Sequence, residues 1–314
     1  MNKNIKSNIM ICLLLTVVFF MITSSNEIIE SVSFSISIWK DNLFPTLFPF
    51  FVVSSLLISY GFIDIIGKLL EKPMSYFFHL KKESSFALAA SLLSGFPSGA
   101  KYTKDLVEKG LIDRDEGSRL LTFTHYSNPL FIMGMIGNIL LNNQKTALII
   151  LISHVFSGLL TGYLLNIKYK NYISFSNNKS INTRSDKKFG ELLQISIFDS
   201  LNTMFLLLGV VTIFLIITTI INNIIALPDI VNVIISGILE MTQGVKNASL
   251  LNYPEIVKVV LITAIISFGG LSVHTQVLSI ISSQKIKYKQ FLLARIIHSI
   301  LASLFVFILY IVFI

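Results

Sequence analysis

Residues 94–101 read Ser-Gly-Phe-Pro-Ser-Gly-Ala-Lys and lie inside a long apolar stretch. Two glycines and a proline so close together interrupt an α-helix, because glycine favours turns and proline lacks a backbone donor. We expect one short helix before the first glycine and a second after it, with Ser98 as its N-cap and Gly110 at its end. The stretch therefore predicts a helical hairpin.

The composition places this hairpin in a membrane. Of 314 residues, 53% are hydrophobic and only 13% are charged, and the mean hydropathy is +0.75, whereas soluble domains carry about 25% charged residues. A spanning helix needs about 20 apolar residues. Clear spans are expected at 9–23, 43–66, 119–141, 145–167, 201–225 and 291–314. The predicted fold class is all-α, a polytopic helical membrane protein with about six to eight membrane helices and two broken or re-entrant hairpins.

The tip of the first hairpin allows two interpretations. The N-terminus of its second arm presents free N–H groups and a partial positive charge, which suit a polar or anionic ligand, and Lys101 would strengthen the attraction. Alternatively, Gly95 and Gly99 only let helices approach closely. A P-loop is excluded, because three residues rather than four separate the glycines and Ala100 stands between Gly99 and Lys101.

A second break follows at residues 124–129, Thr-His-Tyr-Ser-Asn-Pro. The helix before it is expected to begin at Asp113, with Glu116 three residues on as in a capping box. The residue before a proline disfavours helix, so this helix should stop near Ser127 and a new one start after Asn128. Both side chains are predicted to line a site with the first hairpin, and a proline kink satisfied locally is the alternative.

Residues 267–276, Ser-Phe-Gly-Gly-Leu-Ser-Val-His-Thr-Gln, predict a second re-entrant hairpin within 255–283. Gly269 would make the turn and Ser272 would cap the second arm. His274 and Gln276 are polar at membrane depth, where such groups are costly unless they bind something; a lone intramembrane histidine is more often a satisfied interhelical donor. The candidate substrate-binding residues are thus Gly95, Ser98, Gly99, Lys101, Ser127, Asn128, Gly269, Ser272, His274 and Gln276.

Catalytic and metal-binding patterns are missing from the sequence. It has no nucleophile paired with a base and no histidine pair with a carboxylate at metal-ligand spacing, so we expect no enzyme, metal or cofactor. The acids, Glu240 among them, are assigned to the membrane edges. Residues 229–242 are expected to form an interfacial amphipathic helix.

Loop charges orient the chain. Residues 168–188 hold six Lys or Arg against one acid, which indicates a basic cytoplasmic linker. It would join two membrane units, 31–167 and 189–314, that follow an N-terminal transmembrane anchor at 1–30. A cleaved signal peptide is the alternative for that first segment.

An inverted repeat is expected between these two units. The sequence at 38–41 resembles that at 197–200, and the turn at Gly95 resembles that at Gly269. If 255–283 is re-entrant, however, Lys285 falls outside, against the positive-inside rule. A fully crossing 255–283 is the alternative, and cytoplasmic labelling of the lysines that follow it would exclude the repeat in this form.

Three blocks carry a family likeness: Leu-Phe-Pro-Phe-Phe-Val-Val at 47–53, the stretch 94–101, and residues 119–132 with Ser-Asn-Pro at their centre. In order and spacing they resemble Gate (nucleoside-recognition) membrane proteins, most closely the sporulation integral membrane proteins of the YlbJ type. The second half resembles a Gate unit more loosely, chiefly through its Gly-Gly pair.

The resemblance implies a multi-pass protein of the bacterial cytoplasmic membrane with two Gate-like units and a role in sporulation. It implies a transporter-like function for a small polar or anionic solute, nucleoside-like in one reading, and the alternative is a non-transporting scaffold in spore-envelope assembly. The expected partners are membrane lipid and an unidentified small solute, and a homo-oligomer is left open. Nucleic acid is not expected, because the basic residues lie in short loops without interleaved aromatics.

Overall fold

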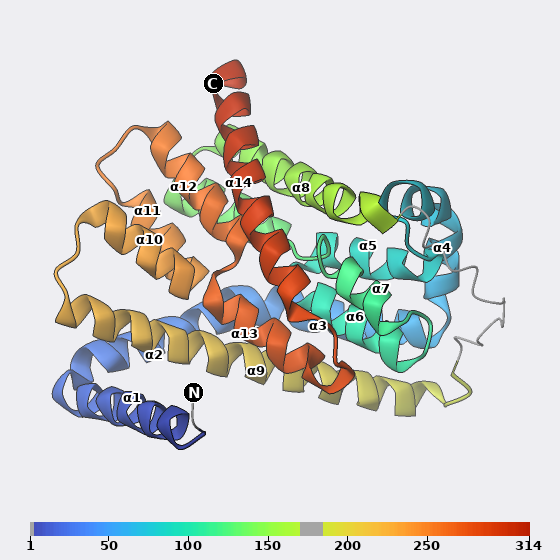
Figure 1. Cartoon of the computed structure of the whole chain (residues 1–314), viewed down its shortest axis with the longest axis horizontal. Helices are drawn as coiled ribbons and strands as arrows, with labels where there is room; N and C mark the ends of the chain where they lie inside the picture. Colours follow the sequence, from blue (N-terminus) through green and yellow to red (C-terminus); the bar gives the residue numbers. More distant parts are fainter. Residues whose placement is uncertain (1–2, 170–184) are drawn as a thin grey trace.

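The structure, a computed structural model, describes residues 3–169 and 185–314. Every regular element in these two ranges is a helix (Figure 1), which confirms the all-α class. Most of the predicted basic linker, residues 170–184, lies outside the described residues.

The N-terminal third consists of two sharply bent helix pairs. The elements are α1 (Lys3–Thr23), α2 (Ser25–Ile38), α3 (Phe44–Ser59) and α4 (Phe62–Pro73). Residues 7–43 bend by 101° after Thr23, and residues 47–78 bend by 89° at Gly61, whose φ of +85° is left-handed. Each pair forms either one broken span or a re-entrant loop. Short π-helical or 3-10 segments lie at Trp39–Leu43 (η1), Met74–Phe78 (η2) and Lys82–Ser84 (η3).

The first predicted hairpin and the helix after it are present. The hairpin is α5 (Ser85–Ser94) followed by α6 (Ser98–Glu108), which lie side by side (Figure 1). The chain then forms α7 (Arg114–Leu120), an extended break, and η4 (Phe131–Leu140), wound as a π-helix. Helix α8 (Gln144–Asn166) follows and ends in a 3-10 turn, η5 (Ile167–Tyr169). The predicted span 119–141 is thus a helix broken in the middle.

The second half has its hairpin in a different place from the predicted one. Its elements are α9 (Phe189–Ile224), α10 (Asp229–Leu239), α11 (Met241–Ser249), α12 (Glu255–Phe268), α13 (Gly270–Ile281), η6 (Ser282–Gln284) and α14 (Tyr288–Phe313). Residues 255–284 form one span-length apolar unit, so the re-entrant prediction for 255–283 is wrong. The tight hairpin is α10–α11, because at Gly237 and Gly244 the two backbones are too close for any side chain to fit between them. Residues 229–242 are therefore not the single helix that was predicted as an interfacial segment, because α10 ends at Leu239 and the chain turns into the hairpin.

This correction removes the conflict with the loop charges. With α12–α13 crossing completely, Lys287 reaches the same end of the molecule as α7, where its Nζ lies 2.7 Å from Asp115 Oδ1. The lysines at 285–289 then fall on the side that the positive-inside rule assigns to the cytoplasm.

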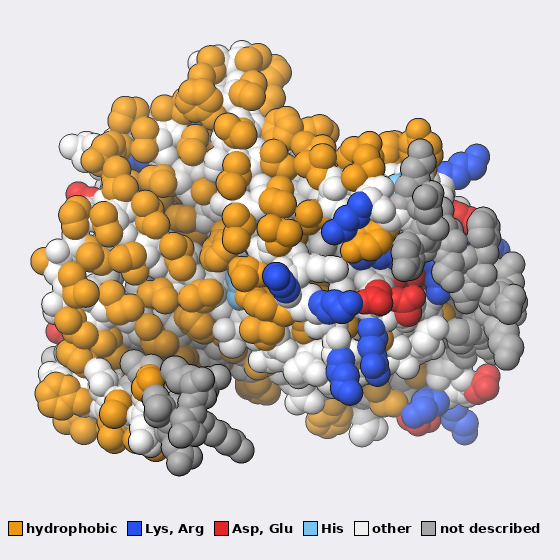
Figure 2. All heavy atoms as spheres, viewed as in Figure 1, with side chains coloured by type: hydrophobic (Ala, Val, Ile, Leu, Met, Phe, Trp, Pro, Cys, Tyr) orange, Lys and Arg blue, Asp and Glu red, His pale blue; other side chains and the backbone are white. Residues whose placement is uncertain are grey.

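Four helices in the described ranges are long and apolar enough to cross a membrane, and six if each bent pair is one span. The outer surface is correspondingly apolar. Hydrophobic side chains cover most of the face in Figure 2, whereas charged ones gather at the end formed by α6, α7 and the turn before α14. In the apolar part of α14 only 17% of residues are buried within the protein. Lipid is the natural solvent for such a face.

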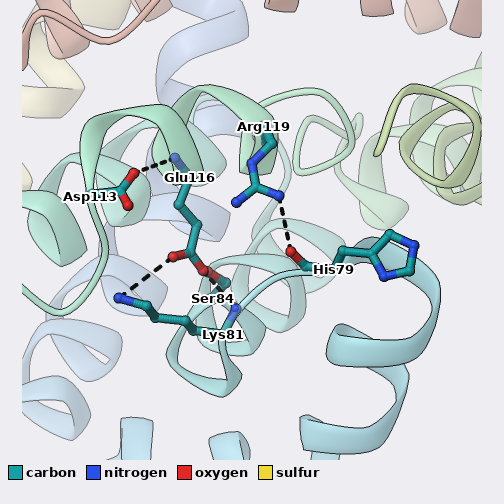
Figure 3. A network of polar contacts seen from close by, with 6 residues as sticks. All are labelled: His79, Lys81, Ser84, Asp113, Glu116 and Arg119. Carbon is teal, nitrogen blue, oxygen red and sulfur yellow. Dashed lines mark hydrogen bonds and ion pairs between the residues drawn. The ribbon is translucent and has the colours of Figure 1, made fainter. Parts of the chain in front are cut away.

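A polar network fixes the charged end (Figure 3). Asp113 caps α7 by accepting from the Glu116 N–H at 2.7 Å, as predicted. The Glu116 side chain is 2% exposed and accepts from the Lys81 N–H at 2.7 Å and the Ser84 hydroxyl at 3.0 Å. Arg119 donates to the His79 carbonyl at 3.0 Å. These bonds tie the start of α7 to the turn that leads into α5.

Candidate functional site

The tip of the first hairpin packs directly onto the break in the following span. Gly95 has φ +79° and ψ −165°, and a Cβ there would lie 2.5 Å from the Asn128 nitrogen. A Cβ on Gly99 would overlap the Thr124 carbonyl. The two glycines thus serve close packing, one of the two interpretations offered for them.

The hairpin tip satisfies much of its own backbone. Helix α6 begins at Ser98 after Pro97, whose carbonyl accepts from the N–H groups of Ala100 and Lys101 at 3.0 and 3.1 Å. The Ser98 hydroxyl donates to the Gly95 carbonyl at 2.5 Å. Ser98 is therefore not the predicted side-chain N-cap, because its hydroxyl closes the turn instead.

The break in the span is held by side chains on both sides. Asn128 donates through Nδ2 to the Ser94 carbonyl at 3.0 Å and accepts at Oδ1 from the Leu130 N–H at 2.7 Å. The Ser127 N–H donates to His154 Nε2 at 2.9 Å. Among the described residues the Ser127 hydroxyl has no hydrogen-bond partner, although Ser127 is 1% exposed.

A fully buried guanidinium supports the break from behind. Arg295 on α14 donates to the carbonyls of Thr122 and His125 at 3.0 and 2.8 Å and bonds His298 Nδ1 at 2.9 Å. No carboxylate of the described chain lies within ion-pair distance of it. The carbonyls at the end of a broken helix carry partial negative charge, so they stabilise this cation.

The tip of the second hairpin carries a buried carboxylate. Glu240 stands between α10 and α11, is 1% exposed, and accepts from the Gln243 N–H at 2.9 Å and from the Thr242 hydroxyl. It thereby caps the N-terminus of α11. Glu240 was assigned to a membrane edge, and its burial was not predicted; the hairpin carries its side chain into the protein interior.

The Gly269–Gly270 turn joins the two halves. Both glycines have left-handed φ, +91° and +69°, and they divide α12 from α13 without making a hairpin. A Cβ on Gly270 would lie 3.1 Å from the Met241 nitrogen, and one on Gly269 would lie 3.7 Å from the Phe96 ring. The turn thus contacts the tips of both hairpins.

A cavity of about 50 Å³ lies where these broken elements meet. Its polar lining is Ser127, Asn128, Glu240, Thr242, Ser272 and Gln276. The rest of the wall is apolar and includes residues of α2, α3, α9 and η4 together with Phe96. A carboxylate, an amide and hydroxyls in an otherwise apolar wall can bind a small polar molecule through hydrogen bonds.

Four of the ten predicted site residues line this cavity: Ser127, Asn128, Ser272 and Gln276. The three glycines and Ser98 shape the turns around it. Lys101 points elsewhere, with Nζ 5.1 Å from the Phe51 ring centre and 3.5 Å from the Thr203 hydroxyl. His274 bonds the Tyr288 hydroxyl at 2.7 Å and the Phe268 carbonyl at 3.1 Å, so both ring nitrogens are used in packing.

The sequence reasoning missed Glu240 and Thr242. A signal was present, because Glu240 is an acid that directly follows the apolar run Ile-Ile-Ser-Gly-Ile-Leu and stands two residues before Thr242. Among the described residues no three His, Cys, Asp or Glu side chains come together as a metal site requires.

Several apolar spans, with broken helices that meet at a buried polar cavity, define a multi-pass integral membrane protein. Residues 42–170 match the sequence profile of the Gate family, described as nucleoside recognition. The chain is also 28% identical over 315 residues to "Sporulation integral membrane protein YlbJ" of Bacillus subtilis (strain 168). The alignment covers 90% of this chain and 77% of that protein. No solved structure matches. Over residues 42–170 the chain is thus similar to Gate domains, and over most of its length it is distantly similar to the B. subtilis sporulation membrane protein, which confirms the resemblance.

Proposed function

We propose that this protein is transporter-like and binds a small polar solute in the cavity between the two hairpin tips. The observation that supports this proposal best is Glu240, a carboxylate buried among Ser127, Asn128 and Thr242 at a point where two membrane-embedded helix breaks meet. Ionisable groups at membrane depth are costly and mark ligand or ion pathways.

The same geometry suggests an inverted repeat with revised partners. In each half a tight hairpin, α5–α6 or α10–α11, precedes a broken span and then one long helix, α8 or α14. The first hairpin would enter from the cytoplasmic side and the second from the opposite side, with the site between their tips as in many secondary transporters.

Glu240 also narrows the solute class. The sequence favoured a polar or anionic solute, with Lys101 as the attracting charge. Lys101 does not line the cavity, and the N-terminus of α11 is already capped by Glu240. The Glu240 side chain supplies hydrogen-bond acceptors, and among the described residues no positive charge lines the cavity, so we propose an uncharged polar or cationic solute.

The relative's name extends the proposal to location and role. We propose the cell membrane of a sporulating bacterium, with lipid around the apolar faces, no nucleic-acid partner and no catalytic reaction. Whether the chain forms a homo-oligomer is a separate question that size measurement in detergent would answer.

The small volume of the cavity favours one alternative to transport, a non-transporting scaffold. About 50 Å³ holds only one or two waters, so a transported solute requires the hairpins to separate. A scaffold for spore-envelope assembly needs no such opening. Capture of specific envelope proteins by crosslinking in sporulating cells, without any solute flux, would favour the scaffold.

Flux in proteoliposomes tests the proposal. The purified protein is reconstituted and uptake of labelled nucleosides, sugars, amino acids and polyamines is measured for wild type, Glu240→Gln and Asp229→Asn. The first substitution keeps a side-chain oxygen that can cap α11 but removes the charge, whereas Asp229 is an exposed acid on the same hairpin. At least a tenfold loss in Glu240→Gln alone is expected. Proteoliposomes of the wild-type protein that take up none of these solutes would refute the transport role, and so would uptake that is unchanged in both Glu240→Gln and Asn128→Ala.

A further inference from the structure

A second polar space lies between α2, α9 and α11 and has a volume of about 320 Å³, the size of a small-molecule site. Its walls include Glu27 and Glu30 from α2, Thr219 and Asn222 from α9, and Gln243 and Lys246 from α11. We call this space the outer recess, because it lies near the end of α9 opposite the charged end of the molecule.

The outer recess adjoins the Glu240 cavity. Gln243 links them, since it lines the outer recess and its backbone N–H donates at 2.9 Å to the carboxylate of Glu240, which lines the cavity. The first turn of α11 separates the two spaces. Movement of this turn would connect them.

The polar groups of the outer recess are arranged so that its acids stay available. The Lys246 ammonium lies 4.5 Å from the Phe34 ring centre, a cation–π contact that holds it against the wall. Neither Glu27 nor Glu30 has an ion-pair partner in the described part of the chain. The Asn222 side-chain oxygen is buried and lacks a hydrogen-bond partner among the same residues.

These charges indicate the sign of the charge that a solute in the outer recess would carry. Two carboxylates against one ammonium leave the outer recess negative, although the whole chain carries +8. The next polar space inward holds a third carboxylate, Glu240. The net negative charge of the outer recess raises the local concentration of cations and excludes anions.

We propose that the outer recess is the vestibule through which solute reaches the Glu240 cavity, and that the solute is a small organic cation such as an amine. This inference rests on the proposed transport function. It adds the route and the charge of the solute, and it makes Glu27 and Glu30 residues that select the solute.

The charge of the outer recess is tested with thiol reagents alone. In a Cys12→Ser background, which removes the exposed native cysteine, Thr219→Cys places a thiol in the wall. A cationic methanethiosulfonate is expected to react faster than an anionic one, by at least about threefold relative to free thiol. Glu27→Gln with Glu30→Gln should abolish this preference. The control is Leu250→Cys, 74% exposed after α11, whose rates should not depend on the two acids.

Flux then tests the route. In the Thr219→Cys protein, modification by the cationic reagent should block Glu240-dependent uptake of a labelled cation, with choline and putrescine as probes, whereas modified Leu250→Cys should transport normally. Unchanged uptake after complete modification of Thr219→Cys overturns the vestibule, and uptake of uridine or aspartate in preference to both cations overturns the charge assignment. If no uptake depends on Glu240, the transport proposal itself fails, and the vestibule role fails with it.

Discussion

Gly95 offers the sharpest test of how the first hairpin meets the broken span. Its backbone conformation, φ +79° and ψ −165°, is one that side chains other than glycine's hardly adopt, at a cost of about 1–3 kcal/mol. In Gly95→Ala the new methyl group would also lie 2.5 Å from the Asn128 nitrogen and 2.7 Å from its Cα. Both atoms belong to the backbone, so the segment itself must shift by nearly 1 Å to restore ordinary contact.

The two costs add because they have separate causes. Overpacking of this kind costs about 1–3 kcal/mol, so we expect Gly95→Ala to lower the free energy of unfolding by about 2–6 kcal/mol in total. At roughly 2 °C for each kcal/mol in a chain of this size, the melting temperature in detergent should fall by at least about 4 °C. The same shift would displace Asn128 and alter the cavity wall.

Two other glycines separate the causes. Gly110 also has a positive φ, +68°, but a Cβ there would meet nothing within 4 Å, so Gly110→Ala should show only the conformational cost, about 1–2 kcal/mol. Gly209 lies in α9 with open space around it, and Gly209→Ala should be neutral or stabilising. Melting of the three variants is followed by size-exclusion chromatography after heating. Equal losses for Gly95→Ala and Gly110→Ala would refute the close contact with Asn128.

Three further outcomes are expected. Burial raises the pKa of the Glu116 carboxyl above its ordinary value, so the native state holds this proton more tightly than the unfolded chain. Its stabilising contribution is present below the ordinary pKa and lost as the pH rises through the native pKa. Glu116→Gln should flatten this part of the pH–stability curve, and an unchanged curve would contradict the assignment. Arg295→Met should lower the free energy of unfolding by about 2–4 kcal/mol, because the buried carbonyls of Thr122 and His125 lose their donor. Arg114→Met, at an exposed position, is the control. Equal melting temperatures for the two variants would contradict the stabilising role of Arg295 at the helix break. In a Cys12→Ser background, Lys289→Cys should be labelled by an impermeant reagent only from the cytoplasmic side, and labelling from outside would exclude the crossing of α12–α13.

The positions of the helix breaks were readable from the sequence, because glycine and proline act on the backbone locally. The turns at Gly95, at Asn128–Pro129 and at Gly269 all appear where they were predicted. The sequence did not show which kind of structure each break produces. The Gly95 turn makes a hairpin, while the Gly269 turn only divides a span, with Gly270 packed against the tip of another hairpin. No local signal reports such a contact.

Glu240 illustrates the same limit at the site. By sequence it is one acid near the end of an apolar run, and its burial depends on α10 and α11 folding against each other through Gly237 and Gly244. Lys101 shows the reverse, since its place in the first turn of α6 suggested a ligand contact but the helix face turns it toward Phe51.

The sequence by itself determined membrane residence, the helical class, the points where helices break and the Gate likeness, because apolar length and backbone chemistry are local properties. Only the tertiary structure decided which segments fold back as tight hairpins, which side chains share a cavity, and that a carboxylate lies among them. Those features depend on close approach between helices far apart in the chain, and sequence spacing alone does not encode that distance.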